Sequence, residues 1–218
     1  MILYATPLTY ERLHIKPSET LHYATEEYYP QYDYINSVKT LEYWSEVFEW
    51  YVELFYFGGK KHLRTVHLST GFTLYFTDVD ESFMPGLGFR IRNELYKYYF
   101  TDESMTYSLN RLYSESFLNF YSRIKDKSRL KSHKIKETAF DADNPMFSSS
   151  ITGGCIDTVS LNKSVNSNCD SENRISRSDM LKKLVTSIFN SDYDTPYSIK
   201  LKPNIIMSQH ELCVYSES

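Results

Sequence analysis

Residues 84–130 read MPGLGFRIRNELYKYYFTDESMTYSLNRLYSESFLNFYSRIKDKSRL, and hydrophobic spacing, capping residues and charge agree better here than elsewhere in the chain. The Pro-Gly start precedes a helix expected over residues 86–100, and the corner Thr101-Asp102-Glu103 offers caps for the next one. A second helix is expected over residues 103–127, where hydrophobic residues recur at helical spacing. These residues are Met105, Leu109, Leu112, Phe117, Phe120 and Ile124. So short a corner makes the two helices antiparallel neighbours and predicts an αα-hairpin.

Residues 37–57 predict a third helix, because large hydrophobic side chains recur along them in steps of three and four. The recurring residues are Leu41, Trp44, Phe48, Tyr51 and Phe55. The pair Gly58-Gly59 follows as a signal for the end of that helix. Residues 62–67 and 72–77 alternate around a Ser-Thr-Gly turn and predict a β-hairpin.

The expected fold class is α+β, with a helical bundle, a small β-hairpin and extended terminal arms. The bundle helices are expected near residues 37–57, 86–100 and 103–127. Four regions are expected. The first is an extended Tyr-rich arm over residues 1–36 with a strand-like start at 2–5, and the second is a helical body with the β-hairpin over residues 37–139. The third is a long Ser/Asn-rich loop over residues 140–178 with one strand at 156–161, and the fourth is a short helix with a strand-like tail over residues 179–218.

Charge is unevenly distributed along the 218 residues, whose formal net charge is −4. Residues 1–57 hold three Lys or Arg against nine Asp or Glu, whereas residues 123–136 hold seven Lys or Arg against Asp126 alone. This asymmetry indicates complementary faces within the chain or between copies. The acidic balance argues against a dedicated nucleic-acid coat protein.

The cysteines and the hydrophobic pattern limit the cellular compartments that the sequence suits. Cys155, Cys169 and Cys213 form no CxxC motif, so free thiols in a reducing compartment are expected. The sequence has no run of about 18 hydrophobic residues, so no membrane span is expected. We also expect no secretory signal, because the first residues lack a charged start followed by a hydrophobic stretch.

Asp78 and Asp80 follow a hydrophobic strand and form a DxD motif. Two carboxylates at this spacing can share a divalent cation bound to nucleotide phosphates, as in metal-dependent nucleotidyl- and glycosyltransferases. The alternative is a turn between a strand and a helix, where Asp is favoured in any case. We favour the turn and expect no metal site, no catalytic residue and no cofactor.

His67-Leu68-Ser69 resembles half of the paired motif of two-histidine phosphoesterases, but the chain has no second copy of it. His62 and His67 are five residues apart, which does not suit a helical metal pair, so we expect surface or edge histidines.

Two further groups of side chains suggest binding. Lys125, Lys127, Arg129 and Lys131 could neutralise DNA phosphates, and the alternatives are a solvated helix end or a contact with the acidic amino-terminal third. Tyr23, Tyr28, Tyr29, Tyr32 and Tyr34 could form a protein interface. The alternative for the tyrosines is codon bias in an AT-rich genome with ordinary core and edge positions.

The order of these elements resembles the second half of tail-tube adaptor proteins of short-tailed phages, over about residues 76–130. The matching segments are Phe76-Thr77-Asp78-Val79-Asp80, Phe83-Met84-Pro85, residues 91–100, Thr101-Asp102-Glu103 and residues 109–126.

The resemblance implies a virion structural protein whose helical hairpin, completed by the helix at 38–57, forms the body of one protomer in a ring. It implies a head-to-tail connector that self-assembles, contacts portal and tail proteins, conducts double-stranded DNA without sequence specificity, and is assembled in the host cytoplasm. We therefore expect a non-enzymatic protein. The alternatives are a metal-dependent transferase using Asp78 and Asp80, or a small viral accessory protein that binds a host partner.

Overall fold

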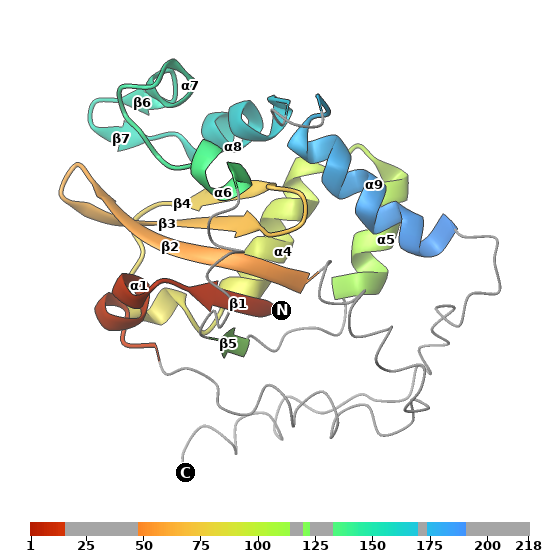
Figure 1. The fold of residues 1–218 in the computed structure, drawn as a ribbon, viewed down its shortest axis with the longest axis horizontal. Coiled ribbons are helices and arrows are strands. Elements are labelled where there is room, and N and C mark those ends of the chain that lie inside the picture. The colour runs from red at the N-terminus through yellow and green to blue at the C-terminus, as the bar shows by residue number, and fades with distance from the viewer. Residues whose placement is uncertain (16–47, 114–119, 123–132, 170–173, 191–218) are drawn as a thin grey trace, which may run out of the picture.

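The computed structural model describes residues 1–15, 48–113, 120–122, 133–169 and 174–190, which Figure 1 draws in colour. These residues form a mixed α+β fold, so the predicted fold class is confirmed at that level. Helices lie on both faces of a central sheet (Figure 1). The predicted helical bundle is not the organising element of the core.

The central sheet has five strands in the order β4-β3-β2-β1-β5. These strands are β1 (Ile2–Ala5), β2 (Glu49–Phe57), β3 (Lys60–His67), β4 (Thr73–Phe76) and β5 (Phe120–Ser122). Strands β2, β3 and β4 form an antiparallel meander, and β1 runs parallel to both β2 and β5. The predicted strand-like segment at 2–5 and the predicted hairpin are therefore confirmed as parts of one larger sheet.

The predicted helix over residues 37–57 is wrong over residues 49–57, which form β2, while residues 37–47 lie outside the described part of the chain. Both faces of β2 are covered, so hydrophobic residues occupy both sets of alternate positions and the two-residue period of a strand is hidden. Within β2 the aromatic side chains of Tyr51 and Phe55, a residue type that fits a pleated sheet well, supplied the apparent helical spacing.

Gly58-Gly59 ends no helix, because it forms the two-residue turn between β2 and β3. Both glycines have positive φ angles, 56° and 75°, as a tight hairpin turn with the twist of the flanking strands requires. Phe57 and Lys60 pair directly across this turn and fix the register of the hairpin.

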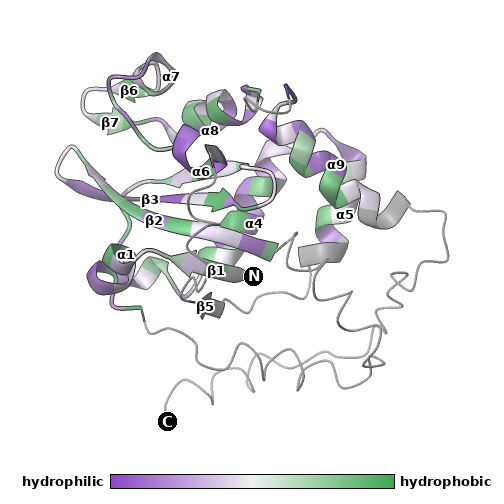
Figure 2. Cartoon of the chain, viewed as in Figure 1, coloured by the Kyte–Doolittle hydropathy of each residue, from purple (hydrophilic) through white to green (hydrophobic). Residues whose placement is uncertain are grey.

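The helices of the described residues are short, apart from α4, α5, α8 and α9. They are α1 (Pro7–Arg12), the 3₁₀ turn η1 (Glu81–Phe83), α4 (Leu87–Tyr98), α5 (Glu103–Tyr113), α6 (His133–Glu137), α7 (Pro145–Ser148), α8 (Thr158–Ser167) and α9 (Arg177–Asn190). Hydrophilic and hydrophobic residues share α4 and α9 in Figure 2, as expected for helices that bury one face.

The second predicted helix, residues 103–127, is confirmed as α5 only to Tyr113. Its continuation is wrong at residues 120–122, which form β5 beside β1. The backbone of β1 needs hydrogen-bond partners on its free side, and the aromatic pair Phe120-Tyr121 fits a strand there.

The predicted loop over residues 140–178 is wrong, because this region contains α7, α8, the start of α9 and a small hairpin of β6 (Ile151–Thr152) and β7 (Cys155–Ile156). Of the predicted strand at 156–161, only Ile156 is in a strand. Polar residues start these helices as caps: the Asp157 carboxylate accepts hydrogen bonds from the amides of Val159 and Ser160 at the start of α8.

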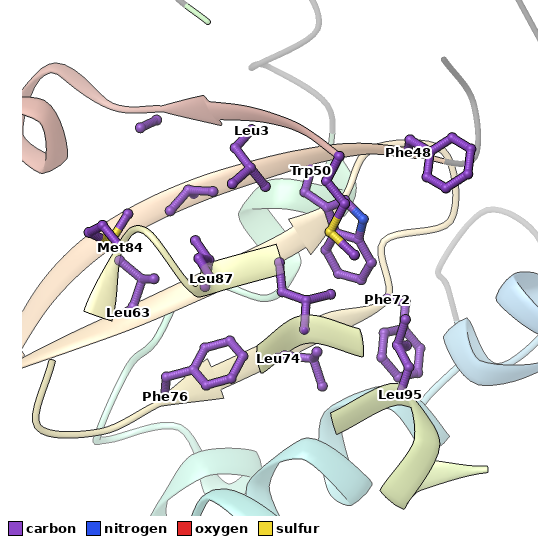
Figure 3. Packing of buried hydrophobic residues seen from close by; sticks show 14 of the residues in the cluster. Leu3, Phe48, Trp50, Leu63, Phe72, Leu74, Phe76, Met84, Leu87 and Leu95 are labelled. Carbon is purple, nitrogen blue, oxygen red and sulfur yellow. The ribbon is translucent and has the colours of Figure 1, made fainter. Parts of the chain in front are cut away.

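The main core lies between the sheet and α4, where strand residues such as Leu3, Trp50, Leu63 and Leu74 meet Leu87 (Figure 3). The short helix predicted after Ser178 is confirmed as part of α9, and Leu181 and Val185 join the same core. The tail predicted over residues 191–218 lies outside the described residues. None of the described helices is long and apolar enough to cross a membrane.

Candidate functional site

The αα-hairpin of α4 and α5 is the predicted element that the structure reproduces most fully. Asp102, at the corner, caps α5: its Oδ1 accepts a hydrogen bond of 3.0 Å from the Met105 amide. Its Oδ2 lies 2.5 Å from Lys182 Nζ on α9. The hydrogen bond from Lys182 is the main reason why the pKa of Asp102 lies below its usual value. One carboxylate thus joins the corner of the hairpin to α9.

Tyr99 ties the end of α4 to the start of α9. Its hydroxyl donates a hydrogen bond of 2.7 Å to the carbonyl of Ser178, and its ring packs on Phe72. Burial raises the pKa of the Tyr99 hydroxyl far above its usual value, so this donor keeps its proton at neutral pH. The hairpin is therefore fixed on the sheet and against α9.

The outward side of the hairpin carries exposed aromatic residues. Leu87, Ile91 and Leu95 face the core and are fully buried, whereas Phe89 is 50% exposed. Phe100, just beyond α4, is 77% exposed, and Tyr107 on α5 is 57% exposed. Tyr96 is half-buried, packs against the main core and donates a hydrogen bond of 2.5 Å to Asn110 Oδ1 on α5. We call Phe89, Phe100 and Tyr107 the aromatic face.

The DxD residues lie at the corner between β4 and η1. Asp78 has a positive φ angle of 53°, a conformation that Asp tolerates in turns. Its carboxylate oxygens lie 3.0 and 3.1 Å from Lys60 Nζ. Asp80 accepts a hydrogen bond of 2.6 Å from Ser82 Oγ, which lowers the pKa of Asp80. Both carboxylates therefore have local partners, as the turn interpretation predicts.

No group of three or more His, Cys, Asp or Glu among the described residues is arranged to hold a metal ion.

A buried charge network lies on the face of the sheet opposite α4, beneath α6. Arg64 on β3 is buried; its Nη1 donates a hydrogen bond of 2.8 Å to the carbonyl of Ile135, and its Nη2 pairs with the Glu53 carboxylate on β2. Beside it, the Tyr75 hydroxyl donates a hydrogen bond to the carbonyl of Thr138. These contacts join α6 to β3, and Thr138, the residue after α6, to β4.

A second buried arginine holds α6 from the other side. Arg177 Nη2 lies 2.6 Å from Glu137 Oε2 at the end of α6, and its Nη1 donates a hydrogen bond of 3.1 Å to the carbonyl of Val165 on α8. Each arginine thus has a carboxylate partner. The arrangement can fix α6, α8 and α9 on the sheet.

Tyr75 and Tyr51, whose ring centroid lies 5.8 Å from the guanidinium carbon of Arg64, are held in their protonated form. Burial is the main cause that raises the pKa of Tyr51 to about 12, and burial also raises the pKa of Tyr75. At neutral pH both hydroxyls are therefore hydrogen-bonding groups and not bases.

Two asparagines of α8 cover the outer edge of β4. Asn162 Oδ1 accepts a hydrogen bond of 2.8 Å from the Tyr75 amide, and Asn166 Oδ1 accepts one of 2.8 Å from the Thr73 amide. Asn166 Nδ2 also donates one of 2.7 Å to the carbonyl of Thr73. Residues 73 and 75 direct these groups away from β3, so α8 supplies the hydrogen bonds that a further strand would supply.

The prediction of surface or edge histidines is wrong, because His62 and His67 are both buried on β3, which lies inside the sheet between β4 and β2. They point to opposite faces. His67 packs edge-on against Trp50, and its Nδ1 lies 3.0 Å from Thr70 Oγ1. His62 stacks on Phe55, and its Nε2 lies 3.0 Å from the carbonyl of Phe57. Both rings are packing and hydrogen-bonding elements.

The predicted binding residues of the basic segment, Lys125, Lys127, Arg129 and Lys131, lie outside the described residues. The same holds for the predicted interface tyrosines Tyr23, Tyr28, Tyr29, Tyr32 and Tyr34. Sequence reasoning missed the Arg64 and Arg177 network. The available signal was Arg64 itself, a charged residue in a segment, LRTV, that otherwise suits a buried strand.

No family model, no curated protein and no solved structure matches this chain.

Proposed function

We propose that this protein is a non-enzymatic, self-associating structural protein of a viral particle, a protomer of a head-to-tail connector. The observation that carries the proposal is the αα-hairpin of residues 87–113, which is fixed to the body by Tyr99 and Asp102 and carries an aromatic face on its outward side. A rigid element with exposed aromatic side chains suits an assembly contact.

The order of elements supports the resemblance on which the connector role rests. Strand β4, the corner at Asp78 and Asp80, α4, the corner at Asp102 and α5 follow one another in the expected order up to Tyr113, whereas residues 120–122, expected within the second helix, form β5. The earlier bundle helix is a strand over residues 49–57, so in this protein the hairpin packs on a sheet. The proposed protomer therefore carries its hairpin on an α+β body.

The further parts of the proposal follow from the connector role. The protomers form a ring in the virion, contact portal and tail proteins, and line a conduit for double-stranded DNA. A net charge of −4 suits such a conduit, because a lumen that repels phosphates lets the duplex slide. No observation at Asp78 or Asp80 favours a transferase, since the Asp78 carboxylate pairs with Lys60 of β3 and the Asp80 carboxylate accepts a hydrogen bond from Ser82.

The test uses the full chain. Its mass is measured by sedimentation velocity over a range of concentrations, and its particles are imaged by negative-stain electron microscopy alone and with the purified portal of a short-tailed phage. We expect closed rings, alone or on the portal. A strictly monomeric protein that never co-sediments with the portal would refute the connector role, and a monomer that binds one host protein would identify an accessory protein instead.

A further inference from the structure

Helix α6 is attached to the sheet mainly through polar groups. It has five residues, too few for a helix that is stable by itself. Among the side chains of α6 that the structure describes, Ile135 alone is buried, and it packs with Tyr51 and Val66 on the sheet. Helix α4, by contrast, buries a hydrophobic face in the main core. Burial of hydrophobic surface therefore holds α6 much more weakly than it holds α4.

The two buried arginines that hold α6 also have partners on the rest of the protein. Arg64 Nη1 donates a hydrogen bond of 2.8 Å to the carbonyl of Ile135, while its Nη2 pairs with Glu53 on β2. Arg177 Nη2 lies 2.6 Å from Glu137 Oε2, while its Nη1 donates to two carbonyls at the end of α8, at 3.1 and 3.4 Å. Removal of α6 therefore leaves neither guanidinium without a partner, which lowers the cost of detaching the helix.

The other polar contacts of this segment end on backbone carbonyls. The Tyr75 hydroxyl donates a hydrogen bond to the carbonyl of Thr138, and Lys134 Nζ donates one of 2.6 Å to the carbonyl of Ser69. When the helix leaves, hydrogen bonds to water replace both of them. Because of this exchange, each contact contributes little net stability.

The attached position of α6 leaves one donor of each arginine unsatisfied. Arg64 Nε and Arg177 Nε are buried, and neither has a hydrogen-bond partner within the described residues. A Cβ at Gly71 would lie 3.6 Å from Arg177 Nε and 3.2 Å from Lys134 Cβ, so this donor lies close to α6. A buried donor without a partner costs free energy that water recovers once it gains access. Detachment of α6 thus relieves part of its own cost.

The chain stays anchored on the carboxyl side of α6. Phe140 stacks on Phe55 at a centroid distance of 4.8 Å and meets Phe147 edge-on at 5.4 Å. Ala139, between Thr138 and Phe140, is exposed. The backbone at Ala139 can therefore rotate without moving a buried side chain, which makes it a pivot.

We propose that α6 is a latch, a segment that detaches from the sheet as a local unit, pivoting at Ala139, while the sheet, α4, α8 and α9 stay folded. Its opening turns three buried hydrogen-bond donors, on Arg64, Tyr75 and Arg177, towards solvent. All the contacts of the latch lie within one chain, so it works in a monomer as well as in a ring and goes beyond the connector role. A protein that forms no ring would leave it standing.

The test is native-state hydrogen exchange of the full chain, followed by NMR over urea concentrations below the unfolding transition. The Ala139 amide reports on the latch, because it donates a hydrogen bond of 3.1 Å to the Lys136 carbonyl. The amide of Thr65, buried in the middle of the sheet, reports on global unfolding. Relative to intrinsic rates, Ala139 should exchange at least about a hundredfold faster than Thr65 and depend little on urea, because a local opening exposes little surface.

Variants separate detachment of α6 from fraying of a helix that stays attached. Glu137→Ala removes the partner of Arg177 and should speed exchange at Ala139 at least about tenfold, because a hydrogen bond to a charged group is lost. Lys136→Ala, a matched truncation at an exposed position of α6, should change it by no more than about twofold.

Tyr75→Phe removes the hydrogen bond to Thr138 without touching α6 itself, and it should also speed exchange at Ala139 severalfold. Circular dichroism confirms that each variant is folded before rates are compared. Exchange at Ala139 as slow and as urea-dependent as at Thr65 would show that α6 opens only with the whole fold and would overturn the proposal. Exchange indifferent to both Glu137→Ala and Tyr75→Phe would overturn it as well, because the helix then frays without detaching.

Discussion

Replacing Asn166 tests the strand-like role of α8 most directly. Asn166 is fully buried, and its amide group makes hydrogen bonds to the Thr73 amide, the Thr73 carbonyl and the Asn162 carbonyl, at 2.8, 2.7 and 2.8 Å. Asn166→Ala leaves both backbone groups of Thr73 buried and without these partners. Each such group costs about 1–3 kcal/mol, so we expect the free energy of unfolding to fall by about 3 kcal/mol.

The size of that loss should follow the number of hydrogen bonds removed. Asn162→Ala removes the side-chain partner of one backbone amide, that of Tyr75, so we expect a loss of about half as much. Asn168→Ala is the control, because Asn168 is exposed and its side chain donates a hydrogen bond of 3.1 Å to the thioether sulfur of Met146, not to the backbone of β4. That change should stay within about 0.5 kcal/mol.

Urea unfolding followed by far-UV circular dichroism measures these losses, and amide hydrogen exchange locates them. In Asn166→Ala, exchange should accelerate at the Thr73 amide more than at residues whose amides face β3. Equal stability of Asn166→Ala and Asn168→Ala, with unchanged protection of the Thr73 amide, would refute the reasoning.

Asn166→Asp sharpens the same test, because aspartate has the shape of asparagine but lacks the donor. The side chain keeps an acceptor for the Thr73 amide and places a carboxylate oxygen against the Thr73 carbonyl. Burial and this repulsion favour the protonated acid, so the folded-state pKa of the new carboxyl rises above the unfolded value. The stability deficit of the variant should therefore shrink as the pH falls from 7 towards 5. A deficit independent of pH would contradict the hydrogen-bond geometry.

Three further predictions concern Asp102 at the corner of the hairpin, the buried Tyr51 and the glycine turns. Asp102→Ala should lower the free energy of unfolding by about 1 kcal/mol in urea titrations, and Asp102→Asn by less because it keeps the cap of α5. The lowered pKa of Asp102 makes its contribution present above about pH 4 and lost as the pH falls through the folded-state value, which acid titration of wild type against Asp102→Asn detects. The protonated Tyr51 hydroxyl should contribute stability that is present below about pH 10 and is lost as the pH rises towards its pKa of about 12. Over that range the wild type should therefore lose more stability than Tyr51→Phe, which alkaline unfolding followed by ultraviolet absorbance measures. Gly58→Ala should destabilise more than Gly153→Ala in thermal unfolding, because both glycines have positive φ but only the Cβ at Gly58 would lie 2.7 Å from the carbonyl oxygen of Gly154.

The αα-hairpin could be predicted from the sequence because α4 and α5 each have one buried face and one solvent-exposed face. Leu87, Ile91 and Leu95 recur at helical spacing, and Asp102 stands where a cap is needed. The short corner between them then fixed the antiparallel arrangement. Local signals were enough here because each helix shows its burial pattern in its own residues.

Strand β2 could not be predicted in the same way, because its burial depends on both neighbours and on helices from distant segments. Trp50 and Val52 point to the main core, while Tyr51 packs with Val66 and Ile135 on the other face. When both faces are covered, hydrophobic residues occupy both sets of alternate positions and the two-residue period of a strand is hidden. A helical interpretation then fits the remaining spacing.

The region after residue 140 was predicted as a loop because its polar residues resemble those of exposed segments. Its Asn, Asp and Ser residues suggested a loop, but several of them have defined hydrogen-bonding roles. Asp157 caps α8, and Asn162 and Asn166 are buried against β4. Polar side chains are buried where a buried backbone group needs a hydrogen-bond partner. The outer edge of β4 has backbone groups of this kind, because no strand lies beside it. The edge is known only once the strand order is known.

The covering of both sheet faces and of the β4 edge supports the hairpin as the surface proposed for assembly. Within the described residues, α4 covers one face, α6 and α8 cover the other, and the two asparagines of α8 occupy the edge of β4. A second copy cannot add a strand at that edge without displacing α8, whose Leu161 and Val165 are fully buried. In the part of the chain that the structure describes, the other exposed large hydrophobic residues come from separate segments: Leu8 on α1, Tyr56 on β2, Val159 on α8 and Ile175 before α9. Phe89, Phe100 and Tyr107 instead share one capped hairpin, so an association driven by hydrophobic burial gains most there.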